Sequence, residues 1–134
     1  MEQIVDLIKE SVIFNSQAHI EMTENAFYEP VGNGTEVSML KWLQKCEIPV
    51  HEIMASREGR ILCHVPFSSM KKRSLIAVRH PVVEDLVRVY VKGAPEIVLN
   101  NCNYQFDVTG STIRFDQDAH TYVTEDIVTG QMCS

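Results

Sequence analysis

The first sixty residues carry hydrophobic positions at helical spacing. Residues 2–14 hold a stripe that recurs every three or four positions, made of Ile4, Val5, Leu7, Ile8 and Val12. This spacing predicts an amphipathic helix, because residues three and four apart share one face. Two more helices are predicted, over residues 36–45 and 49–58, with Thr35 as the N-cap of the first and Pro49 in the first turn of the second. Ahead of them, "EPVGNGTE" reads as a turn.

From residue 60 onward the hydrophobic period changes to two. The stretches "RILCHVPF" (60–67), "SLIAVRH" (74–80) and "LVRVYVK" (86–92) alternate as half-buried strands do. In the first of them Ile61, Cys63 and Val65 are expected on one face. In the last, three valines share one face, and the opposite, polar face carries Arg88, Tyr90 and Lys92.

The order of these elements indicates the fold class. The five-residue link "PVVED" predicts an antiparallel hairpin over residues 74–92, and "QFDVTGSTIRF" predicts another that turns at Thr109 and Gly110. Helices are expected over residues 94–101 and 118–133. Helices, then strands, then helix favour an α+β fold, a twisted antiparallel sheet flanked by helices, in a single domain of residues 1–134.

Composition narrows the class of protein. The chain is 45% hydrophobic and 22% charged, which is ordinary for a globular domain. It contains no run of about 18 apolar residues, so no membrane-spanning segment is expected. The N-terminal residues lack the features of a signal peptide, and a cytosolic setting is the expectation.

The charge distribution disfavours nucleic acid as a partner. The net charge is −6, whereas phosphate backbones need a basic face. The basic residues nevertheless cluster along residues 71–92. They are Lys71, Lys72, Arg73, Arg79, Arg88 and Lys92. An acidic domain with one local basic pocket is better suited to a small anion than to a polyanion.

Several common chemistries are not indicated. The sequence has neither a P-loop nor a dinucleotide-binding fingerprint. Its four cysteines lie far apart, so we expect buried free thiols in place of a zinc site or disulfides, and no metal bound by protein ligands alone. Cys63 and His64 are neighbours on a predicted strand and should point to opposite faces, which argues against a cysteine hydrolase.

Three segments in this order carry a specific resemblance. "VGNGTE" (31–36), "FSSMKKRS" (67–74) and "VKGAPE" (91–96) together resemble the nucleotide-binding domain of P-type cation-transporting ATPases, with the calcium pumps as the nearest group. The resemblance covers nearly the whole chain from about residue 2 and includes "NCN" (101–103) after the last segment.

The resemblance implies an ATP site in which the adenine enters a pocket on the sheet. Phe67 would stack on the adenine ring, and Glu36 would orient its amino group. Lys92 would line the pocket floor, Lys72 would approach the base or the phosphates, and Gly93 would leave room for close approach. Outside this family context, Phe67 would be read as a core residue, Glu36 as a first-turn helix residue and Lys72 as a solvated loop residue.

The resemblance also implies what the chain lacks. The Asp-Lys-Thr-Gly phosphorylation motif is missing, so we expect an excised domain of a membrane pump at the cytosolic face, with no catalytic residue of its own. Its partners would be ATP with Mg²⁺ and the phosphorylation and actuator domains of the pump. Ser69 stands where many relatives carry an arginine, so one phosphate contact would be either missing or supplied by Lys71 or Arg73. The alternative is a non-catalytic module that binds a protein or an anionic headgroup through "KKR".

Overall fold

The computed structural model describes residues 2–129 and contains three antiparallel sheets with helices around them. In chain order the elements are α1 (Glu2–Phe14), β1 (His19–Met22), β2 (Tyr28–Val31), α2 (Gly34–Lys45), α3 (Val50–Ser56), β3 (Ile61–Ser68), β4 (Arg73–Arg79), β5 (Val87–Gly93), α4 (Pro95–Leu99), β6 (Tyr104–Phe106), β7 (Thr112–Arg114), α5 (Gln117–Tyr122) and the π-helical η1 (Val123–Thr129). The predicted α+β class is confirmed. So are both predicted hairpins, β4–β5 and β6–β7. The last predicted helix is confirmed as far as Thr129, and its residues 130–133 lie outside the described part.

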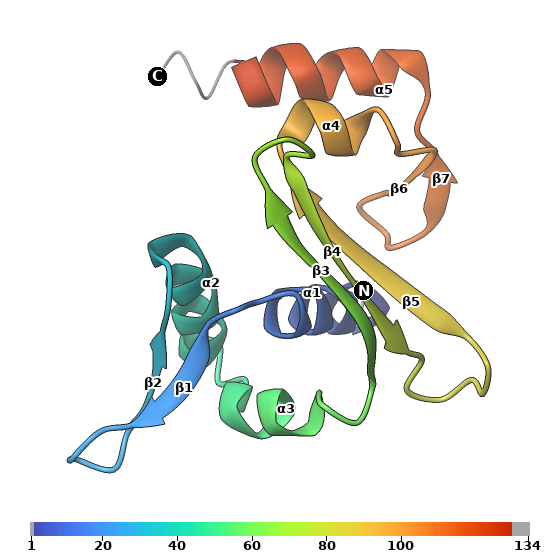
Figure 1. The fold of residues 1–134 in the computed structure, drawn as a ribbon. Helices are drawn as coiled ribbons and strands as arrows, with labels where there is room; N and C mark the ends of the chain where they lie inside the picture. The colour runs from blue at the N-terminus through green and yellow to red at the C-terminus, as the bar shows by residue number, and fades with distance from the viewer. Residues whose placement is uncertain (1, 130–134) are drawn as a thin grey trace.

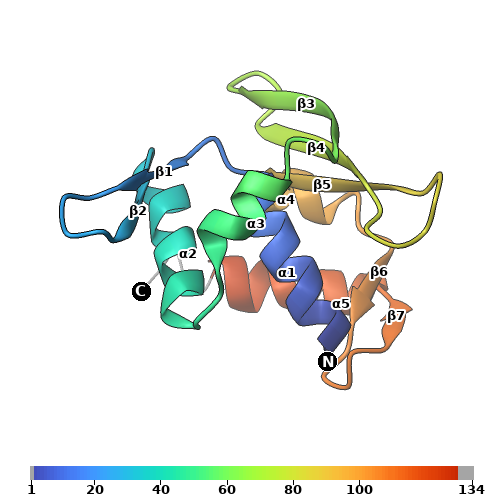
Figure 2. The same ribbon diagram turned by 90° about the horizontal axis from the view of Figure 1, so that it is seen from below.

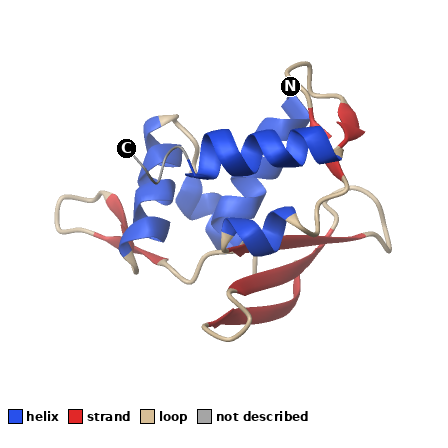
Figure 3. Ribbon diagram, turned by 90° about the horizontal axis from the view of Figure 1, so that it is seen from above, coloured by secondary structure: helices blue, strands red, loops and turns tan. Residues whose placement is uncertain are grey.

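The helices of the first half gather on one face of the three-stranded β3–β4–β5 sheet. Figures 1 and 2 show α1 against the sheet, with α2, α3 and the β1–β2 hairpin beside it. Figure 1 shows α4 and α5 at the other end of the sheet, away from the β1–β2 hairpin, and Figure 3 shows the helices in blue with the strands in red around them. The core between α1, α2, α3 and β4 consists of Ile13, Phe14, Ala18, Leu40, Leu43, Val50, Met54, Ile76 and Val78. The helices within residues 2–129 fall short of the length and apolar character that crossing a bilayer requires.

The polar residues of β5 lie on the buried face of the sheet. Val78 pairs with Arg88, Ile76 with Tyr90, and Ser74 with Lys92. Paired residues share a face, and the three β4 residues are at most 3% exposed, so the β5 side chains opposite them also face the core. The valines of β5 point outward, with Val87, Val89 and Val91 between 43% and 55% exposed.

Two local predictions in the first half are wrong. The side chain of Asn33, and not Thr35, caps α2, because its Oδ1 accepts the Glu36 backbone N–H at 2.9 Å. Pro49 is the residue before α3 and not part of its first turn. The β1–β2 hairpin was not predicted, because "HIEM" and "YEPV" are short and lack a clean alternation. The predicted stripe of α1 is only partly buried, since Val5 and Ile8 are 47% and 42% exposed.

A bulge near the start of β3 changes which residues share a face. Ile61 pairs with Val78, but the register shifts before Cys63, which pairs with Ala77. Ile61 therefore lies on the buried face, and the prediction that it shares a face with Cys63 is wrong. His64 pairs with Ile76, so Cys63 and His64 do point to opposite faces, as predicted.

The cysteines of the described part are free but not buried. Cys46 and Cys63 are exposed and Cys102 is half-buried, whereas we expected buried thiols. Cys63 is exposed because β3 turns it to the outer face of the sheet, with Ala77. Cys133 lies outside the described residues.

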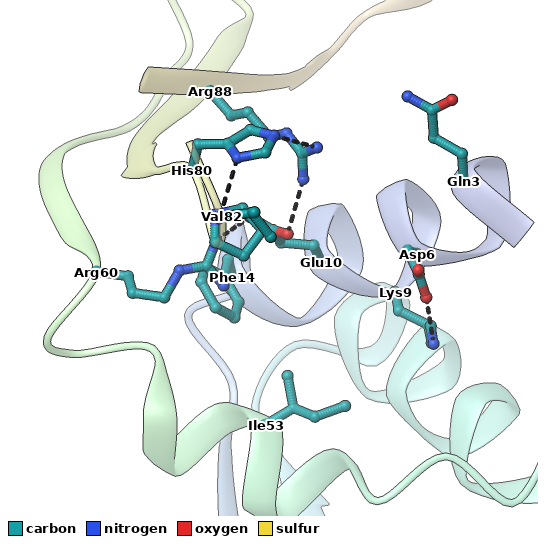
Figure 4. A pocket seen from close by; sticks show the side chains of 11 residues that line it. Gln3, Asp6, Lys9, Glu10, Phe14, Ile53, Arg60, His80, Val82 and Arg88 are labelled. Atoms are coloured by element: carbon teal, nitrogen blue, oxygen red, sulfur yellow. Dashed lines mark hydrogen bonds and ion pairs between the residues drawn. The ribbon is translucent and has the colours of Figure 1, made fainter. Parts of the chain in front are cut away.

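A nearly buried glutamate links α1 to the sheet. Glu10 accepts from the Arg60 guanidinium at 2.7 Å and from Arg88 at 3.2 Å (Figure 4). Arg60 also donates to the Arg79 carbonyl oxygen and lies over the Phe14 ring, 4.8 Å from its centroid. These side chains border a pocket of about 520 Å³ between α1 and the sheet. With two guanidinium groups on one carboxylate, loss of the carboxylate would leave two partly buried cations unpaired.

We expect Glu10→Ala to lower the free energy of unfolding by about 2 to 4 kcal/mol, because both arginines lose their charged acceptor. Urea denaturation of the purified chain measures this. Asp6→Ala is the matched control on the same helix, since within residues 2–129 Asp6 pairs only with Lys9 and its side chain is 61% exposed. The control should cost at most about 1 kcal/mol. Equal losses in the two variants would contradict the assignment of Glu10 as the link.

Candidate functional site

An ion pair joins the end of β5 to the start of α2. The Lys92 ammonium donates to Oε1 of Glu36 and, at 2.5 Å, to the backbone carbonyl oxygen of Asn15. These three residues come from β5, α2 and the end of α1, which are far apart in the sequence. The Glu36 side chain is 11% exposed and that of Lys92 is 43% exposed. The pair therefore lies at the edge of the core, with the lysine reachable from solvent.

Glu36 is fixed by its position in the first turn of α2. Asn33 caps the helix by accepting the Glu36 backbone N–H, which holds the backbone of Glu36 in the first turn. Its Oε2 accepts the backbone N–H groups of Gln17 and Ala18 at 3.1 and 3.2 Å. A carboxylate offers about four lone-pair sites. Lys92 and the two backbone groups use three, so Glu36 can accept one further donor, such as an amino group.

The environment of Glu36 favours its ionised form. Burial raises the pKa of the Glu36 carboxyl. The hydrogen bond and charge of Lys92 and the N–H groups of Gln17 and Ala18 lower this pKa, and together they outweigh the effect of burial. The net result is a pKa below the ordinary value of 4.5. Glu36 is therefore a carboxylate at neutral pH, and so a hydrogen-bond acceptor for Lys92 and for a ligand.

Phe67 lies near the same end of the sheet and is open to solvent. It falls in the irregular stretch of β3 between Val65 and Ser68, where the pairing with β4 shifts. Phe67 is 57% exposed, so it is not a core residue. Ser68 pairs with Arg73, which pairs with Gly93, next to Lys92. The sheet thus brings Phe67 and Lys92 to one end, although 25 positions separate them in the sequence.

Lys72 and Gly93 meet through the backbone at this end of the sheet. Lys72 is exposed and has a φ of 51°, and its carbonyl oxygen accepts the Ala94 N–H at 3.0 Å. A Cβ at Gly93 would collide with that carbonyl and lie 2.8 Å from the Cβ of Arg73. The close approach that Gly93 permits is therefore one between strands of the protein itself. A contact of Gly93 with a nucleotide stays a prediction.

A pocket opens beside this end of the sheet, on the side that faces α1. It has a volume of about 470 Å³. It is lined by Phe14, Ser16, Gln17, Arg57, Ile61, His64, Pro66 and Ile76. Gln17 donates to Glu36, and Pro66 precedes Phe67, so the pocket lies next to two of the predicted ligand contacts, Glu36 and Phe67.

Sequence reasoning did not find three residues of this region: Asn15, Gln17 and Arg57. Asn15 contacts Lys92, and Gln17 contacts Glu36, through backbone atoms, and such contacts leave no signal in residue type. Arg57 donates to the carbonyl oxygens of Ile13 and Ser16 at 2.9 and 3.0 Å. Burial lowers the pKa of its guanidinium, against the opposing charges of Glu58 and Glu36. A lone arginine just after a short helix gives no sequence signal for that contact.

The basic residues do not form the single pocket that the sequence indicated. Arg88 and Lys92 face inward and are paired with Glu10 and Glu36. Lys71, Lys72 and Arg73 are exposed at the turn between β3 and β4. Arg79 is exposed as well, but it lies at the opposite end of β4. The cations of this cluster that an anionic ligand could reach at the Lys92 end of the sheet are therefore those of the turn, together with the exposed part of Lys92.

We expect Glu36→Gln to reduce the free energy of unfolding at pH 7 by about 1 to 3 kcal/mol, by removing a charged hydrogen-bond acceptor. The pKa of Glu36 is lower in the folded chain than in the unfolded chain. Its carboxylate therefore stabilises the fold fully at pH values above the pKa of the unfolded chain. That stabilisation is lost as the pH falls below 4.5 and through the lowered folded value. Urea denaturation of both chains from pH 7 to pH 3 should show the difference shrinking. A difference that stays constant would contradict the assigned ion pair.

Comparison with known proteins identifies the family of this chain. The family model described as P-type ATPase, cytoplasmic domain N, matches residues 3–129. "Calcium-transporting ATPase 2" of Cryptococcus neoformans var. grubii is 29% identical over 130 residues, 91% of this chain and 9% of that protein. "Calcium-transporting ATPase 5, plasma membrane-type" of Oryza sativa subsp. japonica is 34% identical over 110 residues, 81% of this chain and 10% of that protein.

"Calcium-transporting ATPase PAT1" of Dictyostelium discoideum is 27% identical over 126 residues, 94% of this chain and 11% of that protein. The chain thus spans about a tenth of the length of these relatives. The match to the family model extends over α1 to η1 and includes Glu36, Phe67, Lys72, Lys92 and Gly93. The chain therefore belongs to the family of the P-type ATPase cytoplasmic domain N.

Proposed function

We propose that this chain binds ATP as the nucleotide-binding domain of a calcium-transporting P-type ATPase at the cytosolic face of a membrane. The observation that carries the proposal is that an exposed aromatic residue, Phe67 of β3, and a solvent-accessible lysine, Lys92 of β5, lie at the same end of the sheet. The names of the relatives support calcium as the transported ion. In the whole pump, the hydrolysis of ATP would be coupled to ion transport.

The residues at this end of the sheet fit the parts of a nucleotide. A purine base presents a flat face for Phe67 and an amino group for the remaining acceptor position of Glu36. Lys92 supplies a positive charge beside the base, and Lys71, Lys72 and Arg73 supply charges for the phosphates. Gly93 lets the backbone of the β3–β4 turn at Lys72 lie close to the end of β5, next to Lys92 in the sequence.

Magnesium is proposed to come with the triphosphate. Within residues 2–129, no three His, Cys, Asp or Glu side chains lie close enough together to hold a metal ion. Mg²⁺ carried by ATP would neutralise charge on the transferred phosphoryl group. The aspartate that receives this group would belong to the phosphorylation domain of the same pump.

The first test is the affinity of the chain for ATP with and without Phe67. Loss of a stacking aromatic costs about 1 to 3 kcal/mol, so Phe67→Ala should weaken binding about 5- to 150-fold. Titrations followed by NMR or intrinsic fluorescence measure this. Phe27→Ala is the matched control, because Phe27 is 71% exposed at the distant β1–β2 turn.

Two results would count against the Phe67 assignment. One is equal affinity for ATP in the two variants. The other is a sharp fall in the melting temperature of Phe67→Ala with unchanged binding per folded molecule, which would identify Phe67 as a packing residue. Wild-type chain that responds to anionic lipid vesicles and not to ATP would favour the alternative, a module that binds headgroups through Lys71, Lys72 and Arg73.

We further expect the chain to bind ATP without turning it over. The phosphorylation motif is missing from the sequence. Two aspartates near β7 already accept hydrogen bonds from neighbouring residues of the chain. Asp107 accepts from Thr109 and Ser111 in the β6–β7 turn, and Asp116 caps α5 through the Ala119 N–H. A phosphate-release assay at saturating Mg²⁺-ATP should give the buffer rate. Turnover that disappears in Glu36→Gln or Asp107→Asn would contradict the proposal.

A further inference from the structure

The four residues between α1 and β1 touch both members of the ion pair. We refer to residues 15–18 as the connector. The Asn15 carbonyl oxygen accepts the Lys92 ammonium at 2.5 Å. The backbone N–H groups of Gln17 and Ala18 donate to Glu36. The position of the connector therefore determines the positions of the Lys92 ammonium and the Glu36 carboxylate.

One side chain ties the connector to the sheet. The Asn15 amide nitrogen donates to the Tyr90 carbonyl oxygen at 3.3 Å, two residues before Lys92 on β5. Asn15 is 3% exposed, and its own backbone N–H closes the last turn of α1 on Ser11 at 3.1 Å. Among the described residues its amide oxygen has no hydrogen-bond donor. The bond to Tyr90 is thus the one that orients this side chain.

The two hydrogen bonds that the Lys92 ammonium donates leave one of its N–H groups for a third acceptor. An ammonium group has three donors. Glu36 and the Asn15 carbonyl take two of them within the described part of the chain. The lysine side chain is 43% exposed, so its remaining donor is available to a ligand from solvent. With two donors fixed, the direction of the third is fixed too.

We propose that Asn15 is a positioning residue for Lys92: its amide holds the connector on β5, and its carbonyl oxygen orients the ammonium toward the ligand. This inference rests on the proposed nucleotide site, since Lys92 is its predicted ligand contact. The amide donor is the required feature. A side chain that cannot donate to the Tyr90 carbonyl leaves the connector free to shift, and with it the acceptor of Lys92.

The test measures the chemical accessibility of Lys92 without any nucleotide. The chain is acetylated with limiting acetic anhydride, and peptide mass mapping gives the rate at Lys92 relative to exposed Lys45 in the same molecules. Asn15→Ala should raise this ratio about 3- to 10-fold, the effect of losing one hydrogen bond. Affinity for ATP should fall by a similar factor. Asn15→Ser, which keeps a small polar group but cannot reach Tyr90, should behave alike and guards against a variant that fails to fold.

Asn101→Ala is the matched control. The Asn101 amide also donates to a backbone carbonyl, that of Ile97 at 2.7 Å, but it lies exposed near α4. It should change neither the labelling ratio nor ATP affinity. Folded Asn15 variants with the wild-type labelling ratio would overturn the positioning role, whatever their affinity for ATP. A wild-type chain that does not bind ATP, but whose Lys92 labelling responds to Asn15, would instead overturn the proposed function and leave the positioning of Lys92 intact.

Discussion

The charged face of β5 is turned toward the helices, and each of its two cations is paired with a glutamate. Arg88 meets Glu10 of α1 and Lys92 meets Glu36 of α2. A cation at the edge of a core is costly unless an acceptor lies beside it. The packing of α1 and α2 on the sheet must therefore satisfy charge as well as shape. The candidate site is one of these two pairs, at the end of the strand where solvent can reach it.

The corner after β5 depends on a second constraint, the absence of a side chain at Gly93. Its strand partner is Arg73, and the chain before Arg73 turns sharply at Lys72. Any Cβ at Gly93 would meet the backbone of this turn. The glycine lets β4 and β5 stay paired to their ends while the chain turns into α4 at Pro95. The glycine of Lys-Gly-Ala-Pro is thus required beside the β3–β4 turn for a steric reason that needs no ligand.

The sequence was a good guide where periodicity is strong and a poor one where contacts are long-range. α1 and the β4–β5 hairpin have clear spacings and were predicted, and family motifs pointed to Glu36, Phe67 and Lys92. Which face of β5 is buried could not be predicted, because valines normally point inward. The inward orientation of Arg88 and Lys92 depends on Glu10 and Glu36, which lie 78 and 56 residues away from them in the sequence.

Backbone interactions and irregular strands account for the remaining differences. The bulge between Ile61 and Cys63 breaks the alternation from which faces were assigned. Asn33 and Thr35 are both good capping residues, and only the path of the chain decides between them. The carbonyl of Asn15 on Lys92 is invisible to residue type altogether.

Holding Lys92 in place has a consequence for the entropy of binding. A free lysine side chain loses up to about 2 kcal/mol of rotamer freedom when it is immobilised. Here the folded chain has already restricted that freedom through Glu36 and the Asn15 carbonyl, before any ligand arrives. A ligand that accepts the third donor would meet a lysine whose conformational cost was incurred during folding. The affinity of the site is thereby linked to how firmly α1 and α2 are packed on the sheet.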